Sequence, residues 1–135
     1  MSQPLRILIV DDSADDAGIL RHELSRGGYA VESELVETHE AMRAALENQE
    51  WDVIASDHAM PRFSAPAALE LAKQLCPDVP FIIVSGEIDL NLAVSLMRAG
   101  AHDYVQKREL SRICPTVERA PVSYTHLTLP TNREV

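Results

Sequence analysis

The chain has 135 residues, 46% of them hydrophobic, so it can bury one sizeable core but is too short for two ordinary domains. Its 21 acidic residues outweigh 12 basic ones, and a net charge of -9 argues against nucleic acid or an anionic membrane as a direct partner. Two isolated cysteines cannot build a disulfide framework, and no apolar run approaches the length of a membrane span. We therefore expect a single cytoplasmic domain.

Five strand-like runs alternate with segments of helical period along the chain. The runs cover residues 5–10, 30–36, 52–56, 81–84 and 103–105. The first, third and fourth are continuously apolar, as expected when helices cover both faces of a parallel sheet. The second run places Val31 and Leu35 among polar residues, which is typical of an edge strand. This order predicts an α/β fold built on a doubly wound, five-stranded parallel sheet.

Apolar stripes and capping residues mark the intervening helices. Two stripes with helical spacing are expected to face the core, one of Ala68, Leu71, Ala72 and Leu75, the other of Ala93, Leu96 and Met97. Capping preferences predict where the helices start and stop. The expected N-caps are Ser13, Ser64 and Asp89, and the expected stops are Gly27, Gly28 and Gly100.

The C-terminal part of the chain changes character. Leu110, Ile113 and Val117 keep a helical period, but Pro115 lies between them and is expected to kink or interrupt that last helix. Residues 121–135 show neither a helical stripe nor a capped boundary. We interpret this tail as non-domain sequence, either a translated sequencing adapter or a disordered linker, and expect the domain to occupy residues 1–120.

Polar residues follow four of the predicted strands at the point where each strand ends. Asp11 and Asp12 follow the first run, Asp57 the third, Ser85 the fourth, and Lys107 the fifth. Open parallel sheets bind their ligands outside the carboxyl ends of the strands, where the strand order reverses. Carboxylates crowded there repel one another unless a cation offsets the repulsion. The sequence therefore predicts an acidic, cation-binding pocket at this edge.

These five residues, with Met60-Pro61 after Asp57 and the stretch from Gly100 to Tyr104 before Lys107, resemble the receiver domain of two-component response regulators. The resemblance spans about residues 4–120. It implies a flavodoxin-like sheet with strand order 2-1-3-4-5.

The resemblance also implies a chemistry for the acidic pocket. Asp57 corresponds to the phosphoacceptor, the nucleophile that becomes an aspartyl phosphate. Asp11 and Asp12 correspond to residues that bind Mg²⁺ together with Asp57 and a backbone carbonyl, here that of Ala59. Read from the residues alone, one of the two neighbouring Asp residues could instead cap the helix that starts near Ser13.

Three further residues match positions with known roles in the family. Lys107 is expected to contact a phosphoryl oxygen, and Ser85 to donate its hydroxyl to another. Tyr104 matches the aromatic residue that turns inward when the domain switches. Arg108 departs from the pattern, because the family usually has Pro after this lysine.

The resemblance implies a regulatory domain that takes its phosphoryl group from a histidine kinase or phosphotransfer protein and controls an unknown effector. It is expected to assist only its own phosphorylation and dephosphorylation, and not to act as an enzyme on other substrates. The alternative is a Mg²⁺-dependent phosphatase or phosphotransferase that works through an aspartyl phosphate. Such enzymes usually carry a second acid two residues after the nucleophile, where this chain has Ala59.

Overall fold

The computed structural model describes residues 3–57, 63–86 and 90–119. Five parallel strands form one sheet in the order β2-β1-β3-β4-β5. The strands are β1 (Gln3–Val10), β2 (Tyr29–Val36), β3 (Val53–Ser56), β4 (Phe81–Ser85) and β5 (Asp103–Gln106). The predicted fold class and strand order are confirmed, and β2 is at an edge as its polar alternation indicated.

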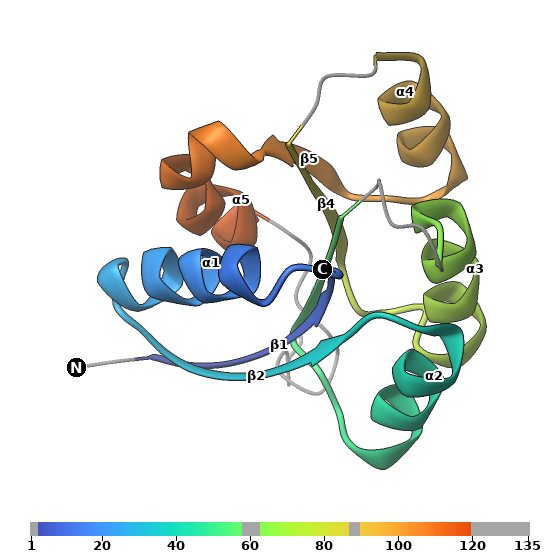
Figure 1. Cartoon of the computed structure of the whole chain (residues 1–135), viewed down its shortest axis with the longest axis horizontal. Coiled ribbons are helices and arrows are strands. Elements are labelled where there is room, and N and C mark those ends of the chain that lie inside the picture. The colour runs from blue at the N-terminus through green and yellow to red at the C-terminus, as the bar shows by residue number, and fades with distance from the viewer. Residues whose placement is uncertain (1–2, 58–62, 87–89, 120–135) are drawn as a thin grey trace, which may run out of the picture.

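Helices cover both faces of this sheet (Figure 1). They are α1 (Ala14–Arg26), α2 (His39–Asn48), α3 (Ala65–Leu75), α4 (Leu90–Ala99) and α5 (Ile113–Arg119), with a 3₁₀ segment, η1 (Lys107–Arg112), between β5 and α5. α1 and α5 lie on one face, while α2, α3 and α4 lie on the other. None of the helices within the described ranges has the length and hydropathy needed to cross a membrane.

The central strands contribute side chains to two apolar layers, one on each face of the sheet. Successive residues of a strand point to opposite faces. Ile7 and Ile9 of β1 accordingly pack with Leu24 of α1, whereas Leu8 and Val10 pack toward α2 and α3. All of these side chains are buried. Because helices cover both faces, polar side chains of the central strands can gather only at the ends of the sheet.

Helix starts follow the predicted caps where the structure describes them. The Ser13 hydroxyl accepts a hydrogen bond from the backbone N–H of Asp16, and the Ser64 hydroxyl accepts one from Ala67. Gly28 and Gly100 adopt φ values of 102° and 124°, which glycine tolerates best. The third expected cap, Asp89, lies outside the described residues.

Two expectations about the later helices need correction. Met97 was expected to face the core, but it is 41% exposed and only Leu96 of that stripe is fully buried. α4 is rotated so that Leu92 and Leu96 point inward, and Met97 lies one step further around the helix.

Pro115 was expected to interrupt the last helix, but it is the third residue of α5. The first turn of an α-helix leaves its N–H groups without partners in the helix, so proline is tolerated there. The irregular residue is Glu109, inside η1, with φ -119° and ψ 38°.

His102 joins the start of β5 to the start of β4. Its Nδ1 accepts a hydrogen bond of 3.0 Å from the backbone N–H of Phe81, and the backbone N–H of His102 donates one of 2.7 Å to the Phe81 carbonyl. The residue is exposed overall, but partial burial of its ring lowers the pKa of His102 below the ordinary 6.5. The neutral ring is therefore the form that the fold accepts.

This arrangement predicts a pH dependence of stability. As the pH falls through about 6.5, the unfolded chain protonates His102 before the native state does, so the free energy of unfolding decreases. In His102→Asn the amide oxygen can keep the Phe81 bond without titrating, and this part of the decrease should disappear. Urea unfolding of both proteins at about pH 7.5 and about pH 5.5 measures the difference. Equal decreases in both would contradict the assignment.

Candidate functional site at the carboxyl edge of the sheet

Asp11 and Asp57 lie side by side because the sheet aligns the ends of β1 and β3. The Asp11 N–H donates to the Val36 carbonyl at 3.0 Å, and the Asp57 N–H donates to the Val10 carbonyl at 2.8 Å. These bonds continue the parallel ladders one residue past the strands. The backbone at both carboxylates is thus fixed by the sheet and does not depend on a flexible loop.

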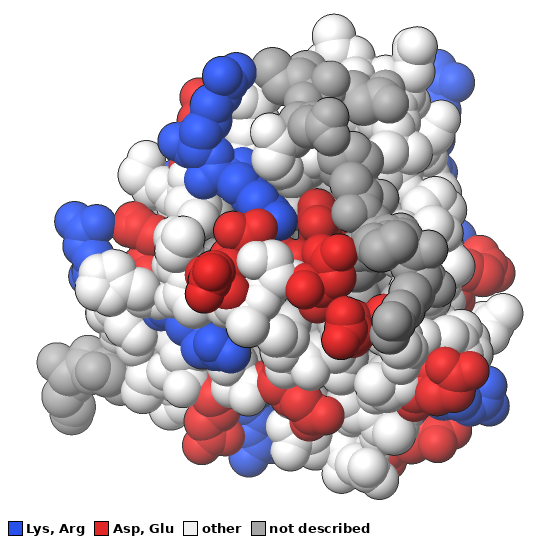
Figure 2. Space-filling view, in the orientation of Figure 1, with Lys and Arg blue, Asp and Glu red and all other residues white. Residues whose placement is uncertain are grey.

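Three carboxylates form what we call the acidic cluster: Asp11, Asp12 and Asp57. One carboxylate oxygen from each lies within 4.8 Å of the others. Asp11 and Asp57 are buried, with 5% and 7% exposure, while Asp12 is exposed. Figure 2 shows acidic side chains gathered beside a basic one near the middle of the molecular face that it draws. The structure thus brings together the three carboxylates that the sequence analysis grouped.

Burial raises the pKa of Asp11 above its ordinary 3.8, although Lys107 and a bond from the Ser13 N–H act in the opposite direction. The charge of Asp57 also contributes to the increase. When ionised, the three carboxylates together with the Lys107 ammonium beside them leave an excess of negative charge. The carboxylate oxygens are the hard donors that Mg²⁺ prefers, and the exposure of Asp12 leaves room for water ligands, so the residues present fit such an ion.

Lys107, directly after β5, places its ammonium among these carboxylates. Its Nζ lies 3.1 Å from Asp11 Oδ2 and 3.5 Å from Asp57 Oδ2. Burial alone would lower the pKa of Lys107, but hydrogen bonds to Asp16 and Asp11, with the charges of Asp11 and Asp57, raise it overall. The lysine is thus held in its charged form beside Asp57.

Arg108 replaces the proline that usually follows this lysine in the family, yet Lys107 still reaches the cluster. The described ranges contain no cis peptide bond. The Arg108 guanidinium turns back to the Gln106 side chain at 2.9 Å. With Arg108 in the following position, the Lys107 ammonium thus still lies within 3.5 Å of Asp57.

The remaining predicted site residues are placed as follows. Ser85 ends β4 and is fully buried, in register with Gln106 of β5. Tyr104 lies opposite Ile83 and packs, half-buried, against the apolar layer that includes α3 and α4. Ala59 lies outside the described residues, so its carbonyl stays a prediction.

Sequence reasoning missed Asp16, the residue nearest to the Lys107 ammonium. Its Oδ2 lies 2.6 Å from Lys107 Nζ. Asp16 follows the N-cap Ser13 by three residues, in the first turn of the helix that starts beside the acidic cluster. That spacing from a strand-end Asp pair is the signal that could have identified it.

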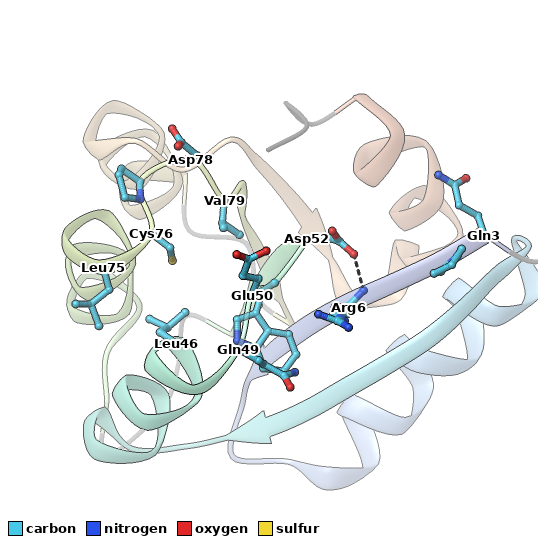
Figure 3. A pocket seen from close by; sticks show the side chains of 13 residues that line it. Gln3, Arg6, Leu46, Gln49, Glu50, Asp52, Leu75, Cys76, Asp78 and Val79 are labelled. Atoms are coloured by element: carbon cyan, nitrogen blue, oxygen red, sulfur yellow. Dashed lines mark hydrogen bonds between the residues drawn. The ribbon is translucent and has the colours of Figure 1, made fainter. Parts of the chain in front are cut away.

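A separate cavity of about 650 Å³ opens at the opposite end of the sheet (Figure 3). Its lining includes Arg6 in the first half of β1, Trp51 before β3, and Cys76 after α3. The Arg6 N–H donates to Asp52 at 2.8 Å there. Burial, with the charge of Asp78, raises the pKa of the Cys76 thiol to about 11, so this cysteine is not an activated nucleophile.

Comparison with known proteins decides the family. A model of the response regulator receiver domain matches residues 7–118. The chain belongs to this family. As a receiver domain of two-component response regulators, it is a regulatory domain, in agreement with the sequence interpretation.

Its relatives include several transcription factors. The DNA-binding transcriptional regulator NtrC of Salmonella typhimurium is 33% identical over 130 residues, covering 96% of this chain and 27% of that protein. The transcriptional regulatory protein PrrA of Mycobacterium tuberculosis is 32% identical over 102 residues, covering 76% and 43%. The chain therefore spans less than half the length of these relatives.

Solved structures give the same answer for the fold. The crystal structure of FixJ-N superposes with a TM-score of 0.75 at 29% identity, covering 95% of this chain and 99% of that one. A receiver domain protein from Clostridium thermocellum gives a TM-score of 0.69 at 27% identity, covering 85% and 95%. The fold of this chain is thus the fold of these solved receiver domains.

Proposed function

We propose that this receiver domain accepts a phosphoryl group on Asp57 from a histidine kinase or phosphotransfer protein, and that it does so in the cytoplasm. The observation that carries the proposal is the Lys107 ammonium, 3.5 Å from a buried Asp57 inside a cluster of three carboxylates. A strand-end Asp that only capped a turn would not need this partner. Ser64 already caps the following helix.

The transfer needs no proton at the nucleophile. An Asp57 carboxylate oxygen attacks the phosphorus of the donor phosphohistidine, and its new P–O bond forms as the P–N bond breaks. The electron pair of the broken bond stays on the imidazole nitrogen of the donor. Lys107 would then place its charge on a phosphoryl oxygen as a single-point contact, and the Ser85 hydroxyl would donate to another.

Asp11, Asp12 and Asp57 would hold Mg²⁺, together with the Ala59 carbonyl. When bound, the ion neutralises charge on the transferring phosphoryl group. The chain's own contribution is to keep two of these carboxylates fixed on adjacent strands, with the third open to solvent. The domain thereby assists its own modification and does not act on other substrates.

Signal output would arise from a population shift that links Ser85 and Tyr104 to the face of α4, β5 and α5. Support comes from the packing of Tyr104 against the apolar layer that includes Leu96 of α4. α4 also exposes apolar side chains, with Leu90 at 72% and Val94 at 49% exposure. Several relatives are named as DNA-binding regulators, so the absence of nucleic-acid contact stays a prediction for this domain alone.

The function is tested by incubating the domain with Mg²⁺ and acetyl phosphate and following its intact mass. A gain of one phosphoryl group that is lost again on standing supports a receiver. EDTA should prevent the gain. Continuous release of inorganic phosphate from many small phosphate esters would instead favour the phosphatase alternative. A folded domain that shows neither reaction would refute the proposal.

Mg²⁺ binding has its own expected result. An ion that binds the native state at a concentration 100 times its Kd stabilises it by about 2.7 kcal/mol, so Mg²⁺ should raise the melting temperature. Asp12→Ala should remove most of this rise, whereas Asp15→Ala, an exposed acid of the neighbouring helical turn, should keep it. Melting curves with EDTA and with Mg²⁺ give the comparison. A full rise in Asp12→Ala would contradict the assigned ligand.

A further inference from the structure

The Lys107 ammonium is shared among three carboxylates, and the nearest belongs to a residue outside the acidic cluster. Its Nζ lies 2.6 Å from Asp16, 3.1 Å from Asp11 and 3.5 Å from Asp57. A charge-assisted hydrogen bond of 2.6 Å is short for this pair of groups. The ammonium of this unphosphorylated domain is therefore drawn toward α1 and away from Asp57.

Asp16 is held in this position by its own helix. Its N–H donates to the Ser13 hydroxyl at 3.1 Å, while the Ser13 N–H donates to Asp11 Oδ1 at 3.0 Å. The first turn of α1 is thus tied to the end of β1, and the Asp16 carboxylate faces Lys107 across that turn. Asp16 and Lys107 also line one cavity, with Ile9, Leu20 and Leu110 as its apolar wall.

We propose that Asp16 is a positioning residue that competes with the phosphoryl group on Asp57 for the Lys107 ammonium. The inference rests on the proposed function of Asp57. In the unphosphorylated domain the Asp16 carboxylate holds the ammonium. When a phosphoryl group arrives, the lysine must move its hydrogen bonds from Asp16 to the new oxygens. Asp16 therefore weakens the phosphorylated state and sets how much donor the domain needs.

The charge of Asp16 also disfavours the phosphorylated state. The Asp16 carboxylate is a further negative charge beside a site that must accept a dianionic phosphoryl group. Its side chain is 38% exposed and that of Lys107 is 18% exposed, so solvent screens the pair only in part. Removing the charge but keeping the shape frees the ammonium and lowers the repulsion at once.

The test compares Asp16→Asn with Asp15→Asn. Both remove one negative charge from the first turn of α1, but Asp15 is exposed to solvent, so general charge and helix-dipole effects are matched. At saturating Mg²⁺, Asp16→Asn should need about fivefold less acetyl phosphate for half-maximal phosphorylation, the size expected for a partly exposed ion pair. Asp15→Asn should match the wild type, and Asp16→Glu should restore much of the wild-type requirement.

A double-mutant cycle shows whether the effect passes through Lys107. In a Lys107→Ala background, the effect of Asp16→Asn on the donor requirement should shrink to the part that comes from lost repulsion alone, and the two substitutions should be non-additive in urea unfolding as well. If the wild type is phosphorylated but the Asp16→Asn and Asp15→Asn variants need equal amounts of donor, this inference alone is overturned. The same holds if the Asp16 effect survives in full without Lys107. A wild type that accepts no phosphoryl group would overturn the proposed function and this inference with it.

Discussion

Asp57→Asn is expected to abolish phosphorylation by acetyl phosphate, because an amide oxygen is a far weaker nucleophile than a carboxylate. The substitution keeps the size of the side chain and its place at the end of β3, where the backbone N–H bonds to Val10. Intact mass after incubation with Mg²⁺ and acetyl phosphate gives the measurement. The wild type should gain one phosphoryl mass and the variant none.

Asp52→Asn is the matched control, since Asp52 is the residue immediately before the other end of the same strand. Its carboxylate accepts the Arg6 N–H and lines the cavity at the opposite edge of the sheet. Phosphorylation of this variant should equal that of the wild type. A phosphoryl gain in Asp57→Asn at the wild-type rate would show that another residue is the acceptor.

Lys107→Ala should lower the rate of phosphorylation by about 100-fold or more, the usual cost of removing one charged donor from a transition state. Lys107→Arg keeps the charge but presents a planar fork in place of a compact ammonium, so it should recover only part of the rate. Rates follow from intact mass against time at saturating Mg²⁺. A Lys107→Ala rate within about twofold of the wild type would contradict the role of the ammonium.

The same variant should lose stability when Mg²⁺ is absent. Asp11 and Asp57 are almost fully buried and would lose a shared cation, at a cost of roughly 1–3 kcal/mol. The pKa of Asp11 is already raised by burial in the wild type and would rise further. The native state of the variant then binds protons more readily than the unfolded chain, so the loss should be greatest near neutral pH and shrink as the pH falls.

The sheet and its edge could be predicted because they depend on patterns that the sequence displays directly. Continuous apolar runs before Asp11 and Asp57 indicated buried parallel strands, and parallel strands bring their carboxyl ends to one edge. The approximate placement of Lys107 followed in the same way from the end of β5. The strand order is therefore enough to explain why these residues lie close together.

The features that sequence reasoning missed depend on side-chain direction within helices. Asp16 reaches Lys107 because its place three residues after Ser13 turns it toward the sheet edge, and Asp15 beside it is exposed. Met97 faces solvent because α4 is rotated by about one residue from the expected stripe. Both outcomes depend on the rotation of a helix about its axis, which an apolar period fixes only loosely.

The most direct test of the phosphoacceptor assignment locates the modified residue. Wild-type protein phosphorylated with acetyl phosphate is treated with borohydride, which reduces an aspartyl phosphate to homoserine, and the digested peptides are sequenced by mass spectrometry. Homoserine is expected at position 57, with unmodified Asp at positions 11, 12 and 16. Homoserine at another of these positions, with Asp57 intact, would contradict the assignment.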